Sequence, residues 1–296
     1  MHNLRASLMM VLAMAGFAAE DAVIKYLADF MPVGQILVAI GAGGAMAFAL
    51  LAWRRGRRVF SRAALRGPVL LRNLSEMLGA GGVVLAISLV PLATVTAILQ
   101  SMPLVVTLGA ALFLREAVGW RRWSAILVGF FGVLIILRPG SVDFDPSALI
   151  AVVALLGLAG RDLATRLVPA DVDSLQLSTW GFTMLVPAGL VLMAFGTAPV
   201  MPTPAQWLWL ALAIGFGMIA YGALVAATRL GDISVTVPFR YTRLLFALFI
   251  GMLVFGEVPD GWTIAGSILV VGAGLFSFWR EVWLQRQAGA SPAARR

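Results

Sequence analysis

The sequence contains no cysteine, and its only histidine is His2, at the start of the chain. The absence of cysteine excludes disulfides, catalytic thiols and iron–sulfur clusters. With one terminal histidine, a histidine-based metal site or catalytic triad is also excluded, so we expect no metal, no cofactor and no enzyme activity. Charged residues make up only 12% of the 296 residues, whereas a soluble domain carries about 25%. The composition therefore argues against a soluble protein.

Lysine is nearly absent as well, since Lys25 is the only one and follows Ile24. A G-x-x-x-x-G-K-[ST] phosphate loop is therefore missing, and the chain carries no ATPase motif of its own. A net charge of +8 would suit a nucleic-acid partner. In so apolar a chain we assign this charge to loops on the cytoplasmic side of a membrane and expect no nucleic acid.

What the sequence has instead is long apolar runs, with 61% hydrophobic residues and a mean hydropathy of +0.95. A helix that spans a bilayer needs about 20 mostly apolar residues. We therefore predict an all-α membrane protein whose partners are the lipid bilayer and a small-molecule substrate. The ten predicted spans lie near residues 4–28, 33–53, 68–90, 92–114, 122–138, 147–166, 174–195, 205–228, 232–255 and 262–283.

The distribution of basic residues predicts the orientation of these spans. With the N-terminus in the cytoplasm, only Lys25 and Arg138 fall outside, and Arg72, Arg240 and Arg243 fall within spans. The rest of the 22 lysines and arginines, Arg161 and Arg166 among them, fall in cytoplasmic segments. Positive charge is retained inside, so both termini are expected in the cytoplasm.

Two stretches of the chain repeat one pattern. Glu116 is followed by Gly119-Trp120 and Gly132, and Glu257 is followed by Gly261-Trp262 and Gly274. The offset is 141 residues at the glutamates and 142 from the Gly-Trp pair onward. The predicted topology places Glu116 at the cytoplasmic side and Glu257 at the outer side, as an inverted duplication requires. Chance similarity between two apolar helices with acidic caps is the alternative.

A set of five spans is odd, so its second copy must be inverted in the bilayer. We therefore predict two inverted five-helix repeats around a central cavity, which is a transporter architecture. The first repeat comprises residues 1–140, the second comprises residues 141–284, and residues 285–296 form a basic cytoplasmic tail.

The same residues carry a family resemblance. Residues 91–98 (PLATVTAI), Pro103-Leu104, Leu114-Arg115-Glu116, Trp120 and Gly129-x-x-Gly132 resemble the EamA module of the drug/metabolite transporter superfamily. Residues 17–25 are similar to its first span, with the usual aromatic-glycine start altered to Gly16-Phe17, and residues 231–235 and Gly256-Glu257 match more loosely. The resemblance covers the whole chain. It implies a ten-helix carrier of the bacterial inner membrane, closest to exporters of aromatic and neutral amino acids.

Charged residues inside the bilayer are costly and mark candidate functional sites. The predicted spans hold three acids and three bases: Glu20, Asp21, Arg72, Glu76, Arg240 and Arg243. Ion pairs that only stabilise the bundle are the alternative interpretation. Arg72 and Glu76 are spaced i,i+4 and can pair on one helix, and Asp162 and Arg166 repeat this spacing. We interpret the second pair as structural.

Arg240 and Arg243 are the leading candidates for substrate binding. Both are predicted near mid-depth and follow Pro238, which should kink the ninth span. The repeat relates this region to Gln100 and to the kink expected at Pro103 in the fourth span. An arginine fork suits a carboxylate, whereas Glu76 or Glu20 would suit an ammonium group. Three aromatic residues could complete the pocket: Trp180, Tyr221 and Tyr241.

The sequence thus predicts a secondary carrier that exports amino acids or similar zwitterionic metabolites by alternating access. Glu20, Asp21 or Glu76 could carry a proton, although facilitated diffusion would need none. One alternative is a carrier for another metabolite or a drug-like cation. A less favoured alternative is an intramembrane enzyme or a signalling subunit.

Overall fold

Helices make up nearly all of the chain that the computed structural model describes, which comprises residues 2–57, 59, 61–116, 118–142, 144–169, 171–230 and 236–289. In chain order they are α1 (His2–Ala28), α2 (Val33–Arg54), η1 (Arg62–Leu65), α3 (Gly67–Leu89), α4 (Leu92–Leu99), α5 (Met102–Phe113), α6 (Trp120–Leu137), α7 (Ala148–Arg166), α8 (Ser174–Phe195), α9 (Pro204–Leu230), η2 (Val237–Tyr241), α11 (Thr242–Phe255) and α12 (Gly261–Gly289). The two η elements are short 3-10 helices.

Ten helical segments of the described residues are long and apolar enough to cross a bilayer. Their bounds agree with the predicted spans to within a few residues; of the ninth span, the described segment runs from Pro238 to Phe255. The predicted start at Asp232, the module residues 231–235 and tail residues 290–296 lie outside the described residues. Large apolar side chains point away from the bundle, such as Phe113 and Phe195, which are 79% and 90% exposed. Such a surface is suited to lipid.

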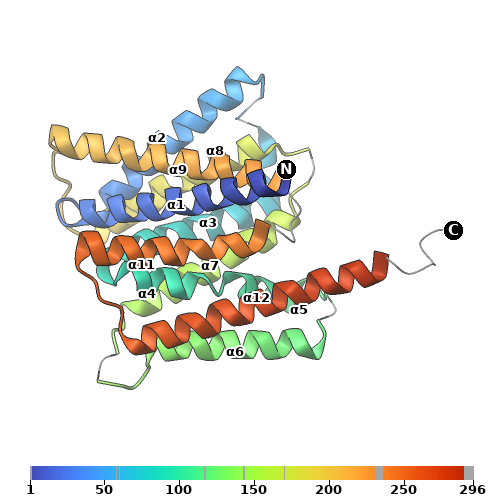
Figure 1. The fold of residues 1–296 in the computed structure, drawn as a ribbon. Coiled ribbons are helices and arrows are strands. Elements are labelled where there is room, and N and C mark those ends of the chain that lie inside the picture. The colour runs from blue at the N-terminus through green and yellow to red at the C-terminus, as the bar shows by residue number, and fades with distance from the viewer. Residues whose placement is uncertain are drawn as a thin grey trace.

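The connections between spans fall alternately at two ends of the bundle (Figure 1). One end, the N-terminal face, holds the start of α1, the end of α12 and the connections α2–α3, α5–α6 and α7–α8. The other end, the distal face, holds the connections α1–α2, α3–α4, α6–α7, α8–α9 and α11–α12. Helices α1 and α7 therefore run in opposite directions, since α1 ends at the distal face and α7 at the N-terminal face.

The helix contacts are related in pairs by the repeat. The first five spans are α1, α2, α3, α4 with α5, and α6; the second five are α7, α8, α9, η2 with α11, and α12. Helix α1 packs along α9, and its counterpart α7 packs along α3. In the same way α1 contacts η2 and α11, while α7 contacts α4 and α5. Helices α2 and α6 each pack against their own counterpart, α8 and α12. These contacts describe two inverted five-helix repeats.

Small residues allow the closest of these crossings. A Cβ atom added to Gly157 on α7 would lie 2.5 Å from the amide nitrogen of Gly79 on α3. A Cβ atom on Gly16 of α1 would lie 2.9 Å from Cβ of Ala220 on α9. Both residues of the second pair are related to the first by the 141-residue offset. Small residues at these positions let the two backbones approach closely.

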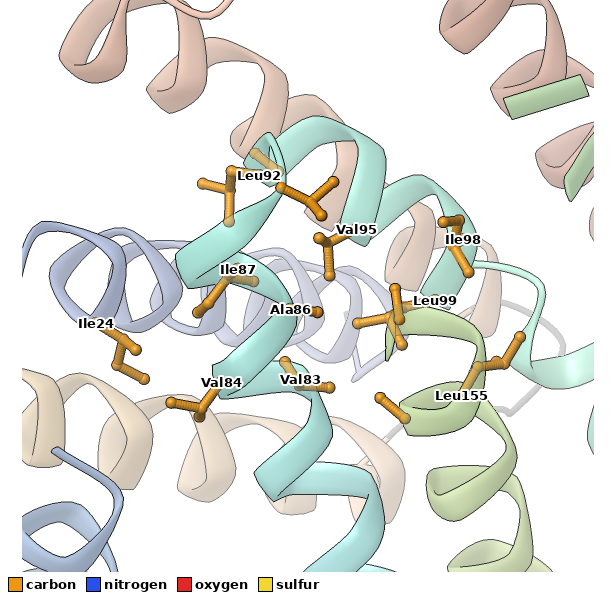
Figure 2. Close-up of a cluster of buried hydrophobic side chains, with 14 of the residues drawn as sticks. Ile24, Val83, Val84, Ala86, Ile87, Leu92, Val95, Ile98, Leu99 and Leu155 are labelled. Carbon is orange, nitrogen blue, oxygen red and sulfur yellow. The ribbon is translucent and has the colours of Figure 1, made fainter. Parts of the chain in front are cut away.

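The largest buried apolar cluster lies toward the distal face. It joins the last turns of α1 and α3, all of α4 and the first turns of α7, with members that include Ile24, Ile87, Leu92, Ile98 and Leu155. Figure 2 shows these side chains converging between α3, α4 and α7. The half of the bundle at the N-terminal face holds three smaller, separate clusters. The distal half therefore holds the larger buried apolar core.

Candidate functional site

Charged side chains gather on α1 and α7 at positions related by the repeat. Glu20 and Asp21 on α1 correspond, at the offset of 141, to Arg161 and Asp162 on α7. Each pair lies one turn of helix before the basic residue near that helix's end. In each pair the first residue faces the helix that packs along its own: Glu20 faces Gly217 on α9, and Arg161 faces Glu76 on α3. The repeat thus builds two comparable polar sites, and their contents differ.

The site between α3 and α7 is a neutral ion-pair network. Arg72 lies 3.1 Å from Glu76, as the i,i+4 spacing predicts. Arg161 lies 3.2 Å from the other oxygen of Glu76 and 2.8 Å from Asp162. Arg72 also donates a hydrogen bond to the carbonyl of Leu177 on α8. The two arginines and the two acids therefore balance one another in charge.

One prediction about α7 was wrong. Asp162 does not pair with Arg166, because Arg161 pairs with Asp162 and Arg166 reaches Glu116, 3.1 Å away. Arg161, which was counted with the basic residues on the cytoplasmic side and not among the candidate site residues, belongs to a candidate membrane span, and its side chain is only 25% exposed. The sequence did contain a signal for Arg161. The 141-residue offset makes Arg161 the repeat counterpart of Glu20.

The site between α1 and α9 begins with one strong ion pair. Arg243 on α11 lies 2.6 Å from Asp21, whose side chain is 9% exposed. The Arg243 guanidinium also lies over the ring of Phe17, 5.3 Å from its centroid. Asp21 is therefore neutralised by a base from the second repeat, and the pair ties α1 to the broken ninth span.

Glu20 has no such partner. Within the part of the chain that the structure describes, no basic side chain lies within 4.0 Å of its carboxylate. A Cβ atom on Gly217 of α9 would lie 2.6 Å from Glu20 Oε1, so the missing side chain makes the space that Glu20 occupies. Gly217 is the repeat counterpart of Glu76. Where α7 and α3 hold a paired arginine and acid, α1 and α9 hold an acid facing a glycine.

Arg240 is the matching base without a partner. Among the described residues, no carboxylate lies within 4.0 Å of its guanidinium, although its carbonyl lies 3.4 Å from the Gln100 side-chain amide. The residue belongs to η2, which contacts α1, and lies one turn before Arg243. Both broken spans meet here. Helix α4 ends at Leu99 and α5 begins at Met102, so this interruption precedes Pro103, while Pro238 lies at the start of η2.

The three predicted aromatic residues lie in different surroundings. Tyr221 Oη on α9 lies 2.6 Å from Ser178 Oγ, and its ring meets Phe48 edge-on. Tyr241 packs its hydroxyl against Gly274 of α12. Trp180 donates its indole N–H to the carbonyl of Val59, 3.0 Å away, in the connection between α2 and η1. The structure therefore does not bring Trp180 and Tyr241 together with Tyr221.

A separate hollow of about 450 Å³ lies between α2 and α9. Its lining is almost entirely apolar, with Val38, Leu210 and Ile214 among its residues. The side-chain amide of Gln35, in the lining, donates a hydrogen bond to the carbonyl of Val200 and accepts one from the Val200 N–H. None of the charged residues described above lines it.

A family model for the EamA-like transporter family matches residues 4–138 and again residues 146–279. The two matches coincide with the two sets of five helices. The chain belongs to the EamA-like transporter family. It is a multi-pass membrane transporter, and this is a family of carriers rather than of enzymes.

Several curated proteins are similar to this EamA-like transporter. A riboflavin transporter of Vibrio cholerae is 30% identical, with 97% of each chain covered. An S-adenosylmethionine uptake transporter of Rickettsia bellii is 29% identical over 72% of each chain. A pseudopaline exporter of Pseudomonas aeruginosa is 29% identical, covering 90% of this chain and 93% of that protein. A solved crystal structure shares the fold, with a TM-score of 0.59 at 17% identity over 94% of this chain and 98% of that one.

Proposed function

We propose that this transporter carries a small zwitterionic metabolite, such as an amino acid or a compound with an amino-acid group. The observation that carries the proposal is that Glu20 and Arg240 have no ion-pair partner among the described residues. The charges around them pair with one another: Asp21, Arg72, Glu76, Arg161, Asp162 and Arg243. A buried charge without a partner is costly. A substrate that brings one carboxylate and one ammonium group would neutralise both.

The two residues have complementary roles in this proposal. The guanidinium of Arg240 binds the substrate carboxylate through two parallel hydrogen bonds. Glu20 binds the ammonium group, and Gln100 and Tyr221 supply neutral hydrogen-bonding groups nearby. Asp21 and Glu76 take no part in binding, because Arg243 occupies the first and two arginines occupy the second. Of the three acids that could carry a proton, Glu20, Asp21 and Glu76, Glu20 is then the one that can release a proton when the ammonium group of the substrate binds.

The names of the relatives allow this proposal to be tested against alternatives. S-adenosylmethionine contains an α-amino acid group and would use both charges, whereas riboflavin has neither a carboxylate nor an ammonium group. The names also include both uptake and export. The expected direction of export rests on the resemblance to amino-acid exporters, and a carrier moves its substrate along the gradients that drive it.

Thermal shift and entrance counterflow test the substrate class without assuming a direction. Detergent-purified protein is heated with amino acids, S-adenosylmethionine and riboflavin, and each hit is then counterflowed in proteoliposomes loaded with unlabelled compound. Ligand at 100 times its Kd should stabilise the protein by about 2.7 kcal/mol. Zwitterions should stabilise the protein and exchange. Stabilisation by riboflavin alone would contradict the proposal.

Substitution of the two charges tests their roles. Losing a charge-assisted hydrogen bond costs about 1.5–3 kcal/mol, so Arg240→Gln and Glu20→Gln should each weaken binding by about 10- to 150-fold. Asp29→Asn, an exposed acid at the end of α1, is the matched control and should change nothing. An amine analogue without the carboxylate should be insensitive to Arg240→Gln. Equal losses for every ligand would indicate a structural role instead.

We also propose that the N-terminal face is cytoplasmic. Its α2–α3 connection alone carries the exposed arginines Arg55, Arg57 and Arg66, whereas Lys25 and Arg138 are the basic residues of the described distal face. Because the chain has no cysteine, single cysteines at the exposed residues Trp53 and Val258 report the orientation directly. In intact cells an impermeant maleimide should label Val258→Cys and spare Trp53→Cys. The reverse pattern would invert the assignment.

A further inference from the structure

A buried ion pair joins several helices at the distal face. Lys25, near the end of α1, lies 3.0 Å from Glu257, which follows α11. The Lys25 ammonium also donates to the carbonyls of Ile87 and Val90 at the end of α3, at 3.1 and 2.9 Å. The second oxygen of Glu257 accepts the backbone N–H of Leu92, 2.8 Å away, at the start of α4. We call Lys25 and Glu257 the distal pair; it joins four helices of the two repeats.

The N-terminal face carries the repeat counterpart of this pair. Arg166 at the end of α7 lies 3.1 Å from Glu116, which follows α5. Both residues are related to the distal pair by the offset of 141, Arg166 to Lys25 and Glu116 to Glu257. The backbone matches too, since the Glu116 N–H donates to Ala110 and the Glu257 N–H to Gly251, again 141 residues apart. We call Arg166 and Glu116 the N-terminal pair.

Each pair crosses between the repeats. The base of the first repeat holds the acid of the second at the distal face, and the base of the second holds the acid of the first at the N-terminal face. In both, the base ends the first helix of one repeat, and the acid ends the fourth span of the other. Movement of one repeat against the other therefore changes both pairs together.

The two pairs differ in burial. Lys25 and Glu257 are 17% and 13% exposed, whereas Arg166 and Glu116 are each 50% exposed. The difference follows the apolar packing, because the large cluster lies beside the distal pair, with Ile24, Ile87 and Leu92 among its members. An exposed ion pair contributes little, since water competes for both charges, while one that is buried and hydrogen-bonded responds strongly to the loss of either partner. The same chemistry is thus tight at one face and loose at the other.

We propose that the distal and N-terminal pairs are the two alternating gates of this transporter, and that the structure is the state closed at the distal face. Exchange of the roles of the two repeats gives the mirrored state, with Arg166 and Glu116 buried and Lys25 and Glu257 solvated. Each pair stabilises only the state in which its own face is closed. The inference rests on the proposed carrier function, but it concerns the gates and not the substrate.

Distances between spin labels test the gates without any substrate. The label pair Phe30→Cys and Val258→Cys reports on the distal face, and Trp120→Cys with Leu167→Cys reports on the N-terminal face; all four residues are exposed. In each label background, Lys25→Met, Glu257→Gln and the double variant are compared with the parent protein. Asp260→Asn is the matched control, because it breaks the Arg138 ion pair at the same face. That pair has no repeat counterpart: at the offset of 142 Arg138 corresponds to Arg280, but the stretch between Glu116 and Gly119 that corresponds to the position of Asp260 contains no acid.

We expect Glu257→Gln to add a longer distance at the distal face and a shorter one at the N-terminal face. The ratio of the two states should shift about tenfold. The double variant should shift the ratio no further than either single variant, since all three variants remove the same Lys25–Glu257 ion pair. Arg166→Gln should shift the ratio little, and the control should not shift it.

Two results would overturn the proposal. The first is distance distributions that do not respond to any of the three variants. The second is a distal face that loosens while the N-terminal face stays unchanged, which would make the pair a local clamp. Because no ligand is added, a carrier of some other substrate would still show the exchange. Failure of the gates is therefore distinguishable from failure of the zwitterion proposal.

Discussion

Glu20 on α1 occupies space that Gly217 on α9 leaves empty, with Oε1 2.6 Å from where a Cβ atom of residue 217 would be. At the repeat-related crossing, α7 and α3 place Arg161 against Glu76, 3.2 Å apart. The duplication therefore produced two similar helix crossings and different chemistry in each. One became a satisfied ion pair, and the other an acid without a basic partner among the described residues.

Gly217→Ala should displace the Glu20 carboxylate without unfolding the protein, because the atoms in the way are the end of a flexible side chain. We expect binding of the zwitterionic ligand to weaken by about 1 kcal/mol, or about fivefold. Gly215→Ala is the control, since nothing lies within 4 Å of an added Cβ there. Titration of both variants with a ligand found by thermal shift measures the difference. Equal affinities would remove Gly217 from the site.

Gly157→Ala should destabilise the bundle itself, because its Cβ would lie 2.5 Å from the Gly79 amide nitrogen and backbone cannot move aside cheaply. Overpacking of this kind costs about 1–3 kcal/mol. Thermal unfolding in detergent, followed by tryptophan fluorescence, should show a lower Tm than in Gly222→Ala, where an added Cβ meets open space. The two variants unfolding together would contradict the close α3–α7 crossing.

Asp21→Asn should be strongly destabilising, since it leaves Arg243 partly buried beside an amide. Breaking a buried ion pair by removing one partner costs about 3–5 kcal/mol. The double variant Asp21→Asn/Arg243→Gln should recover much of this loss, because no uncompensated charge remains. Thermal unfolding of the two single variants and the double variant gives the coupling. Simple additivity would mean that the two side chains do not act as a pair.

Asp260 should give the distal face a stability that depends on pH. Burial raises the pKa of Asp260, but hydrogen bonds from Thr263 at the start of α12 and the Arg138 guanidinium outweigh it and hold the pKa below its usual range. A depressed carboxyl pKa stabilises the fold above the unfolded value, about 4, and this contribution is lost as pH falls through the folded pKa.

Asp260→Ala removes a helix cap, which costs about 1 kcal/mol of unfolding free energy. It should therefore lower the Tm at pH 7. The difference from the parent protein should stay constant down to about pH 5 and shrink below about pH 4. Asp260→Asn keeps a capping side chain and should lose only the part that depends on charge. A difference that grows on acidification would contradict the sign of the pKa shift.

Much of the architecture could be predicted from the sequence. The ten spans needed only the local density of apolar residues, and the inverted repeat needed only Glu116, Glu257 and the glycines that follow them. The predicted start of the ninth span at Asp232 lies outside the described residues. The kink expected at Pro238 falls in the 3-10 helix η2, since a proline marks a break locally in the sequence.

The pairing of the charges was predicted less well, because it is not a local property. The Arg72–Glu76 pair, which the i,i+4 spacing made possible, does form, since such neighbours share one face of the helix. The equally spaced Asp162 and Arg166 do not pair, because each has a different partner nearby. Asp162 pairs with the adjacent Arg161, and Arg166 pairs with Glu116, which follows α5. Spacing identifies possible partners, and packing selects among them.

By itself the sequence determined that this chain lies in a membrane as ten helices in two inverted sets, and that few charges enter the bilayer. Hydrophobicity and charge act locally, so they can be counted residue by residue. Only the tertiary structure decided that Arg243 neutralises Asp21, that Arg161 and Arg72 share Glu76, and that Glu20 and Arg240 have no ion-pair partner in the described part of the chain. These relationships join helices far apart in the chain, and they exist only where close packing brings those helices within ion-pair distance.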